Sequence, residues 1–334
     1  MRRREFLASL AGASTLPIGA AAQQRKLPLL AMVHPFQPVE VMSRTASLSE
    51  SNRAFLDELA RLGYVEGESI RIDRWTAAGK PERFAALAQE VAQSRPDVIH
   101  VVGARLAQHL KAASSEIPIV AMTADPVAWG LAASIARPGG NITGVTSDVG
   151  TELATKHLEL LKELTPTASR VGLLAPKAVL ESAYFRALRD AAQKVGVAII
   201  PLPLESPINE AEYRRVFAAI TADQAHGLII GEAPENFANR SLIFELVAGH
   251  RLPTIYAAAD YARSGGLMSY GVVYADLMRR MAQFIDQILK GAKPSDMPFE
   301  QPTRLHLVIN LKAAEKARIA IPPTLLARAD EVIE

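Results

Sequence analysis

Short apolar runs alternate with amphipathic stretches along almost the whole chain, and this order constrains the fold more than any other feature. In the first half, continuous apolar runs at 26–33, 97–102 and 117–122 predict buried strands, and the alternating run 69–75 predicts a strand near a sheet edge. Between them lie stretches with apolar residues at helical spacing, such as 51–62. Strands that alternate with helices of this length indicate a parallel sheet with right-handed crossovers.

The second half repeats this order of elements without repeating the sequence. Its predicted helices cover 152–164, 181–195, 209–222, 239–250, 274–289 and a segment from Leu311, and its predicted strands cover 170–175, 197–204, 227–231, 254–258, 267–270 and 304–309. The fold class that follows is α/β, with two doubly wound parallel-sheet lobes joined by a three-segment hinge.

The expected lobes are discontinuous in the sequence. Lobe 1 is expected to hold residues 27–145 with about 270–295, and lobe 2 residues 146–269 with about 296–334. The connections are expected near 143–147, 265–270 and 298–306. Three connections would let two rigid lobes close over a ligand by hinge bending.

The stretch 117–146 connects the two expected lobes. A strand at 117–122 runs into a polar turn at 123–126, a predicted helix at 127–135 and a second short strand at 141–146. Ligands of open α/β sheets bind beyond the carboxyl ends of the strands, which makes Thr123, Asp125 and Thr146 candidate ligand contacts. Asp125 precedes Pro126, so its carboxylate is as well suited to capping the following helix.

Two further strand ends in the first half offer candidate contacts. His34 and Phe36 follow the first strand, where ligand sites commonly combine aromatic side chains with a few polar groups. Arg105 follows the strand at 97–102, and its guanidinium is suited to clamping a carboxylate. The alternative for Arg105 is a solvated position on a helix surface.

The corresponding loops of the second half give Lys177, Glu232 and Asp260. Glu232 is suited to an ammonium group, and Lys177 to a carboxylate. Tyr270, which is expected in a connecting strand, is suited either to stacking on a planar ligand or to packing at the hinge.

The N-terminus has the composition of an export signal. Arg2, Arg3 and Arg4 precede an apolar run that ends in small residues at 20–22, which predicts a signal peptide at 1–22 with Gln23 as the first mature residue. The pattern Arg3-Arg4-Glu5-Phe6-Leu7 fits the twin-arginine signal, and general secretion remains the alternative. The chain contains no cysteine, which excludes a lipid anchor at that cleavage site, disulfides and cysteine-bound metals. These features predict a free protein of the periplasm.

Charge and motifs narrow the class of function. Residues 1–22 hold three of the 37 basic and one of the 35 acidic residues, so the remaining chain has no formal net charge, which argues against nucleic acid as a partner. No later apolar stretch is long enough to span a membrane. The sequence has no G-x-S-x-G, H-E-x-x-H, phosphate-loop or G-x-G-x-x-G motif after a strand. We therefore predict a protein without enzymatic activity, metal or cofactor.

Several motifs resemble one family. They are Leu62-Gly63-Tyr64-Val65-Glu66-Gly67, Asp125-Pro126, Arg137-Pro138-Gly139-Gly140-Asn141-Ile142-Thr143-Gly144-Val145, Gly265-Gly266-Leu267-Met268-Ser269-Tyr270-Gly271 and Val308-Ile309-Asn310-Leu311-Lys312. In these segments the chain resembles the periplasmic substrate-binding proteins of ABC transporters, in the branch with tryptophan- and tyrosine-type members. The resemblance implies the type I periplasmic-binding-protein fold, a monomer, and delivery of a small-molecule ligand to an ABC permease in the inner membrane.

The sequence leaves alternatives open for both the ligand and the role of the protein. Family members that bind amino acids carry Ser or Asn in several ligand loops, where this chain has His34-Pro35, Ala104-Arg105 and Pro176-Lys177. The ligand is therefore expected to be an amino acid or an aromatic or carboxylate compound. A periplasmic sensor module for a receptor kinase is the alternative role, and a secreted enzyme is the third, because a fold does not fix a function.

Overall fold

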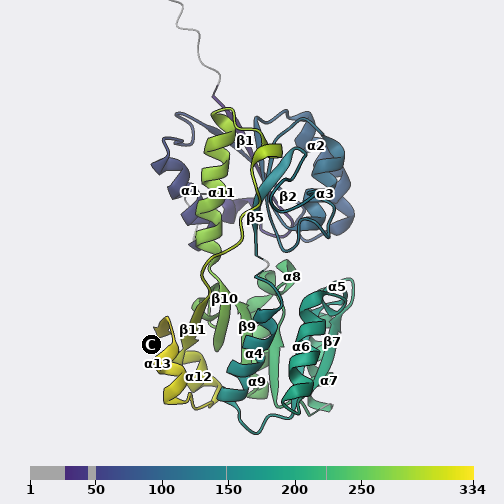
Figure 1. The fold of residues 1–334 in the computed structure, drawn as a ribbon, viewed down its shortest axis with the longest axis vertical. Coiled ribbons are helices and arrows are strands. Elements are labelled where there is room, and N and C mark those ends of the chain that lie inside the picture. The colour runs from purple at the N-terminus through teal and green to yellow at the C-terminus, as the bar shows by residue number, and fades with distance from the viewer. Residues whose placement is uncertain (1–26, 44–49, 148, 223) are drawn as a thin grey trace, which may run out of the picture.

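The computed structural model describes residues 27–43, 50–147, 149–222 and 224–334, and the predicted signal peptide lies outside them. Two lobes, each built on its own sheet, lie one above the other (Figure 1). No helix in the described ranges is both long and apolar enough to cross a bilayer.

The sheet of lobe 1 has five parallel strands in the order β2-β1-β3-β4-β5. Its strands are β1 Leu29–His34, β2 Arg71–Thr76, β3 Val98–Val102, β4 Ile119–Thr123 and β5 Ile142–Thr146. The edge position of β2 confirms the prediction from its alternating sequence. Met32 of β1 lies opposite Arg74 of β2 and His100 of β3.

Helices cover both faces of this sheet. On one face, α1 and α11 pack against each other and against the core that contains Met32 and Val120; on the other, α2 and α3 cover Ala31 and Ala121. The helices are α1 Glu50–Arg61, α2 Phe84–Gln93, α3 Ala104–Ala113 and α11 Tyr274–Leu289, with short 3-10 turns η1 Val39–Met42, η2 Pro81–Arg83 and η3 Pro294–Asp296. The helix α11 comes from the C-terminal part of the chain, so lobe 1 is discontinuous in sequence (Figure 1).

Lobe 2 has seven strands in the order β12-β11-β10-β9-β8-β6-β7. They are β6 Arg170–Pro176, β7 Ala198–Leu204, β8 Gly227–Ile230, β9 Thr254–Ala258, β10 Met268–Val272, β11 His306–Asn310 and β12 Glu331–Ile333. All pairs are parallel except β10 with β11, where the chain returns from lobe 1 and pairs antiparallel.

The helices of lobe 2 pack around this sheet. They are α4 Glu152–Leu164, α5 Lys177–Leu180, α6 Ala183–Lys194, α7 Glu210–Ala222, α8 Pro234–Ala238, α9 Arg240–His250, α10 Ala259–Arg263, α12 Leu311–Ala317 and α13 Pro323–Arg328. The central strands carry uninterrupted buried runs, such as the four residues of β8, as expected for a sheet covered on both sides.

The chain passes between the lobes three times. It leaves lobe 1 after β5, re-enters it between β10 and α11 at Val273, and returns to lobe 2 between Glu300 and His306. The predicted second connection at 265–270 is wrong, because Met268–Val272 pairs on both sides within the lobe 2 sheet as β10. In both sheets the parallel strands therefore point their carboxyl ends at the connections, and so toward the other lobe (Figure 1).

The predicted helix at 127–135 is absent, and the chain forms turns there. The Asp125 carboxylate accepts the N–H groups of Val127 and Ala128, each at 2.9 Å, which begins one helix-like turn. Gly130 then adopts a positive φ of 64°, a conformation that stops a right-handed helix.

Candidate ligand-binding site

We call the residues at and just beyond the carboxyl ends of β1, β3, β4, β5, β6, β8 and β9 the inter-lobe face. Nine of the ten residues predicted from the sequence lie there, namely His34, Phe36, Arg105, Thr123, Asp125, Thr146, Lys177, Glu232 and Asp260. The first six belong to lobe 1 and the last three to lobe 2. The topology thus brings together strand ends that are up to 226 residues apart in sequence, from His34 to Asp260.

His34 ends β1 with a defined side-chain orientation. Its Nδ1 accepts the N–H of Phe36 at 3.1 Å and that of Gln37 at 2.9 Å. The side chain is half-buried, and burial, together with the neighbouring His100, lowers the pKa of His34 to about 3. The ring is therefore neutral at physiological pH.

The two threonines of the inter-lobe face differ in how their hydroxyl groups are used. Thr146 Oγ1 donates to the carbonyl oxygen of Ala124, which ties the end of β5 to the loop after β4. Thr123 is buried, and its hydroxyl has no hydrogen-bond partner in the described part of the chain. A buried hydroxyl without a partner is costly, so Thr123 is the better candidate to contact a ligand.

Arg105 and Glu235 place opposite charges on the two lobes. Arg105 is exposed in the first turn of α3, with its guanidinium carbon 6.0 Å from the centre of the Phe84 ring. Glu235 lies in α8 of lobe 2, where burial raises the pKa of its carboxyl group and the charge of Arg105 opposes that rise. The residue before α3 is Gly103, which has no side chain to cap the helix, so its first N–H groups add to the positive character of lobe 1.

Glu232 and Phe237, which flank Glu235 in the sequence, both contact Tyr274. Tyr274 donates its hydroxyl to Glu232 at 3.3 Å, and its ring packs edge-on against Phe237 with centroids 5.6 Å apart. Burial raises the pKa of Tyr274, so its hydroxyl keeps the proton that it donates. The buried amide of Asn236 fixes α8, because it donates to the carbonyl of Gly231 at 2.8 Å.

Asp260 and Lys177 have different surroundings on lobe 2. The buried carboxylate of Asp260 accepts the N–H of Tyr274, the first residue of α11, at 2.9 Å. Asp260 is thus directed at a connection between the lobes. Lys177 begins α5 directly after β6, and its side chain is exposed.

Tyr270 does not lie where the sequence analysis expected it. It belongs to β10 within the lobe 2 sheet rather than to a connecting strand, and its ring lies 6.4 Å from that of His157 in α4, centroid to centroid. Its carbonyl accepts from His157 Nε2 at 2.6 Å, and His157 Nδ1 accepts the hydroxyl of Tyr184 at 2.7 Å. Tyr270 therefore packs against α4 within lobe 2 rather than at a connection between the lobes.

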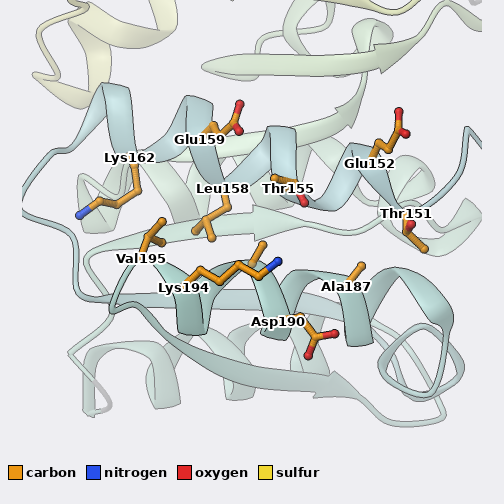
Figure 2. Close-up of a pocket in the computed structure, with 11 residues that line it drawn as sticks. Thr151, Glu152, Thr155, Leu158, Glu159, Lys162, Ala187, Asp190, Lys194 and Val195 are labelled. Atoms are coloured by element: carbon orange, nitrogen blue, oxygen red, sulfur yellow. The ribbon is translucent and has the colours of Figure 1, made fainter.

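Figure 2 shows a groove that lies elsewhere, between α4 and α6 of lobe 2. Side chains of both charges reach it, among them Glu152, Lys162 and Lys194, over an apolar floor that includes Leu158. None of the ten predicted residues lines this groove.

Glu235, Phe237 and Tyr274 were not among the contacts predicted from the sequence. Glu235 lies in α8, three residues after Glu232 at the same strand end, so the strand-end rule could have included it. Phe237 and Tyr274 carried no signal, because their contact joins α8 to the start of α11. Within the described ranges, no group of three or more His, Asp or Glu side chains is placed to hold a metal ion.

Comparisons with known proteins agree with this architecture. Residues 38–333 match the family model described as ABC transporter substrate binding protein. The chain is 26% identical over 294 residues to the tyrosine-binding protein of Clostridioides difficile, covering 85% of this chain and 82% of that protein.

Two solved structures have the same fold over 92% of this chain and all of the other chain. One is a conserved domain protein from Vibrio cholerae, with a TM-score of 0.80 and 25% identity. The other is a domain from Streptococcus pneumoniae in complex with L-Trp, with a TM-score of 0.79 and 23% identity. Both match the two-lobed arrangement found here.

Proposed function

Because the chain belongs to the family of ABC transporter substrate-binding proteins, and so is a binding protein rather than an enzyme, we propose that it is the solute receptor of an ABC importer. In this proposal the two lobes close on a small zwitterion of the aromatic amino-acid class, and the closed form delivers it to a membrane permease. Export by residues 1–22 to the periplasm is part of the proposal.

The opposite charges of the two lobes carry the proposal. Arg105 and the uncapped first turn of α3 favour a carboxylate on lobe 1, and Glu232 and Glu235 favour an ammonium on lobe 2. A zwitterion that touches both lobes stabilises the closed form, because a ligand shifts an equilibrium only by its differential affinity for the two states. The half-buried rings of Phe237 and Tyr274 offer an apolar surface to an aromatic side chain.

The relatives support the same ligand class. The Clostridioides difficile relative is named for tyrosine, and the Streptococcus pneumoniae structure holds L-Trp. Both ligands carry one carboxylate, one ammonium and one aromatic ring.

Calorimetric titration of residues 23–334, freed of co-purified ligand, tests the proposal with L-tyrosine and L-tryptophan. Each amino acid should bind, and each should do so at least tenfold more tightly than the matching amine, which lacks the carboxylate, and the matching acid, which lacks the ammonium. In a thermal-shift assay, an amino acid at a hundred times its dissociation constant should add about 2.7 kcal/mol of stability. Equal binding of the amino acid and either half-molecule would contradict the proposed charge pairing, and no binding of any probe would contradict the ligand class.

Replacement of Arg105 tests the lobe 1 charge. We expect Arg105→Gln to weaken amino-acid binding about tenfold or more, since a hydrogen bond to a charged group contributes about 1.5–3 kcal/mol. The amine, which has no carboxylate, should bind the variant and the unaltered protein equally. Arg189→Gln is the matched control, because Arg189 is also exposed on a helix with its guanidinium 5.9 Å from a phenylalanine ring, but lies on α6 away from the inter-lobe face. Equal losses in both variants would rule out a specific role for Arg105.

A further inference from the structure

The backbone after β1 fixes the position of the one ring proton of His34. Phe36 and Gln37 both direct their N–H groups at Nδ1, at 3.1 and 2.9 Å. A backbone N–H can only donate, so Nδ1 must offer its lone pair. The neutral ring carries a single proton, which must then lie on Nε2.

This arrangement resists protonation of the ring. A second proton would lie on Nδ1 and would break both backbone hydrogen bonds, and the ring is half-buried beside another histidine, His100, which is itself buried. The low pKa of His34, about 3, agrees with this geometry.

The turn that holds the ring is itself anchored to α1. Asn52, which is buried in α1, donates its side-chain N–H to Gln37 Oε1 at 2.7 Å and to the Val41 carbonyl at 3.2 Å. The segment after β1 is therefore held by hydrogen bonds to α1. Such a preorganised donor costs little to engage, because its ordering is already part of folding.

Among the described residues, the other ring nitrogen, Nε2, is not needed to hold the ring in place. In the described ranges, no protein atom accepts a hydrogen bond from it, and His34 lies at the inter-lobe face as the last residue of β1. We propose that His34 is a donor-only contact, whose Nε2–H selects an acceptor oxygen of the ligand, a carboxylate or a carbonyl, and rejects an ammonium at that position. This inference rests on the proposed function and deepens it, since it assigns lobe 1 to the oxygen-bearing end of the ligand.

Two substitutions at His34 test the roles of the two ring nitrogens separately. His34→Asn places an amide oxygen near the position of Nδ1, so it can accept the N–H groups of Phe36 and Gln37, but no atom reaches the position of Nε2. His34→Gln reaches the position of Nε2 with an amide N–H but has no acceptor near Nδ1. We expect His34→Asn to melt within about 2 °C of the unaltered protein and to bind L-tyrosine or L-tryptophan at least tenfold more weakly. His34→Gln should melt at a lower temperature and bind more tightly than His34→Asn.

The outcomes distinguish this inference from the proposed function. If the unaltered protein binds neither amino acid, the proposed function fails and the inference fails with it. If the protein binds and His34→Asn binds equally well, only the inference is wrong. Nitrogen NMR of the ligand-free protein tests the premise of the inference: at pH 7 the His34 ring should carry its proton on Nε2 alone. A proton on Nδ1 would overturn the inference whatever the ligand.

Discussion

Replacement of Gly144 by alanine should destabilise the protein by about 4 kcal/mol or more, the range of the most damaging substitutions. Gly144 lies in β5 with a φ of +147°, which side chains rarely adopt, and a Cβ built there would lie 2.0 Å from the carbonyl oxygen of Ala121 in β4. Neither backbone can move freely, because the two strands are paired along their whole length. The free energy of unfolding, measured by urea denaturation, gives the size of the effect.

The same site couples stability to the connections between the lobes. Glu300 donates its N–H to the Gly144 carbonyl at 3.0 Å, and its own carbonyl accepts from Thr146 at 2.8 Å. The last connection between the lobes is thus hydrogen-bonded to the strand that leads into the first. A displaced β5 would alter both, so we expect any folded Gly144→Ala protein to lose ligand affinity as well.

Gly140→Ala is the matched control. Gly140 lies four residues earlier in the same segment, its φ is not positive, and a Cβ there would meet nothing within 4 Å. We expect a change of at most about 1 kcal/mol, in the stabilising direction, since alanine restricts the unfolded chain more than glycine does. Equal urea midpoints for the two variants would show that β5 tolerates a side chain at Gly144.

A similar close approach occurs in β10, the strand that leads into the second connection. A Cβ at Gly271 would lie 1.9 Å from the carbonyl oxygen of Ala257 in β9, where the pairing of β9 and β10 is irregular. Both strands that leave a lobe therefore bring a glycine against the backbone of the neighbouring strand. Side chains are excluded at both points, which sets the path of the chain between the lobes.

Several elements were predicted with the correct bounds because their ends carry local signals. The helix Glu152–Leu164, the strand Thr254–Ala258 and the helix Tyr274–Leu289 have the predicted bounds. The short helices α8 and α10 were missed, since five residues are too few to show a helical period. The absent helix at 127–135 shows the converse, because an apolar pattern that suited a helix was overridden by the left-handed conformation of Gly130.

The position of the candidate site could be predicted from the sequence, but the pairing of side chains across the two lobes could not. The rule that ligands bind beyond strand ends located His34, Arg105 and Glu232 from the sequence. It could not pair Arg105 with Glu235, because that relation depends on how two sheets face each other. It could not give the tautomer of His34 either, since the tautomer follows from the direction of two backbone N–H groups after the strand ends.

Asp260 is a buried carboxyl group at a connection between the lobes. Its carboxylate holds the N–H of Tyr274, where the chain enters α11 of lobe 1. Burial is the main cause that raises the pKa of Asp260 from 3.8 to about 6; the N–H of Tyr274 and the charge of Arg263 oppose the rise, and Glu50 adds to it. Arg263 also lies 2.7 Å from a carboxylate oxygen of Glu331 in lobe 2 and 3.6 Å from one of Glu50 in lobe 1. The carboxylate of Asp260 thus lies beside an ion pair that joins the lobes.

This raised pKa predicts a stability that falls as the pH rises through a defined window. Between pH 4 and pH 6 the folded protein holds a proton on Asp260 that the unfolded chain has released, so raising the pH favours unfolding, and the loss is complete above about pH 6. A rise of this pKa from 3.8 to about 6 corresponds to about 3 kcal/mol. Asp260→Asn keeps an acceptor for the Tyr274 N–H but cannot ionise.

We therefore expect Asp260→Asn to be more stable than the unaltered protein at pH 7, by up to about 3 kcal/mol, and the difference to vanish near pH 4. Urea denaturation at both pH values measures it. Asp276→Asn is the control, because Asp276 lies in the first turn of α11, the helix that Tyr274 begins, but is exposed, and its replacement should not give the gain in stability at pH 7. A stability difference for Asp260→Asn that stays constant from pH 4 to pH 7 would show that its carboxyl group does not titrate there. If the difference does vanish, the ionised carboxylate of Asp260 at the second connection costs stability at neutral pH.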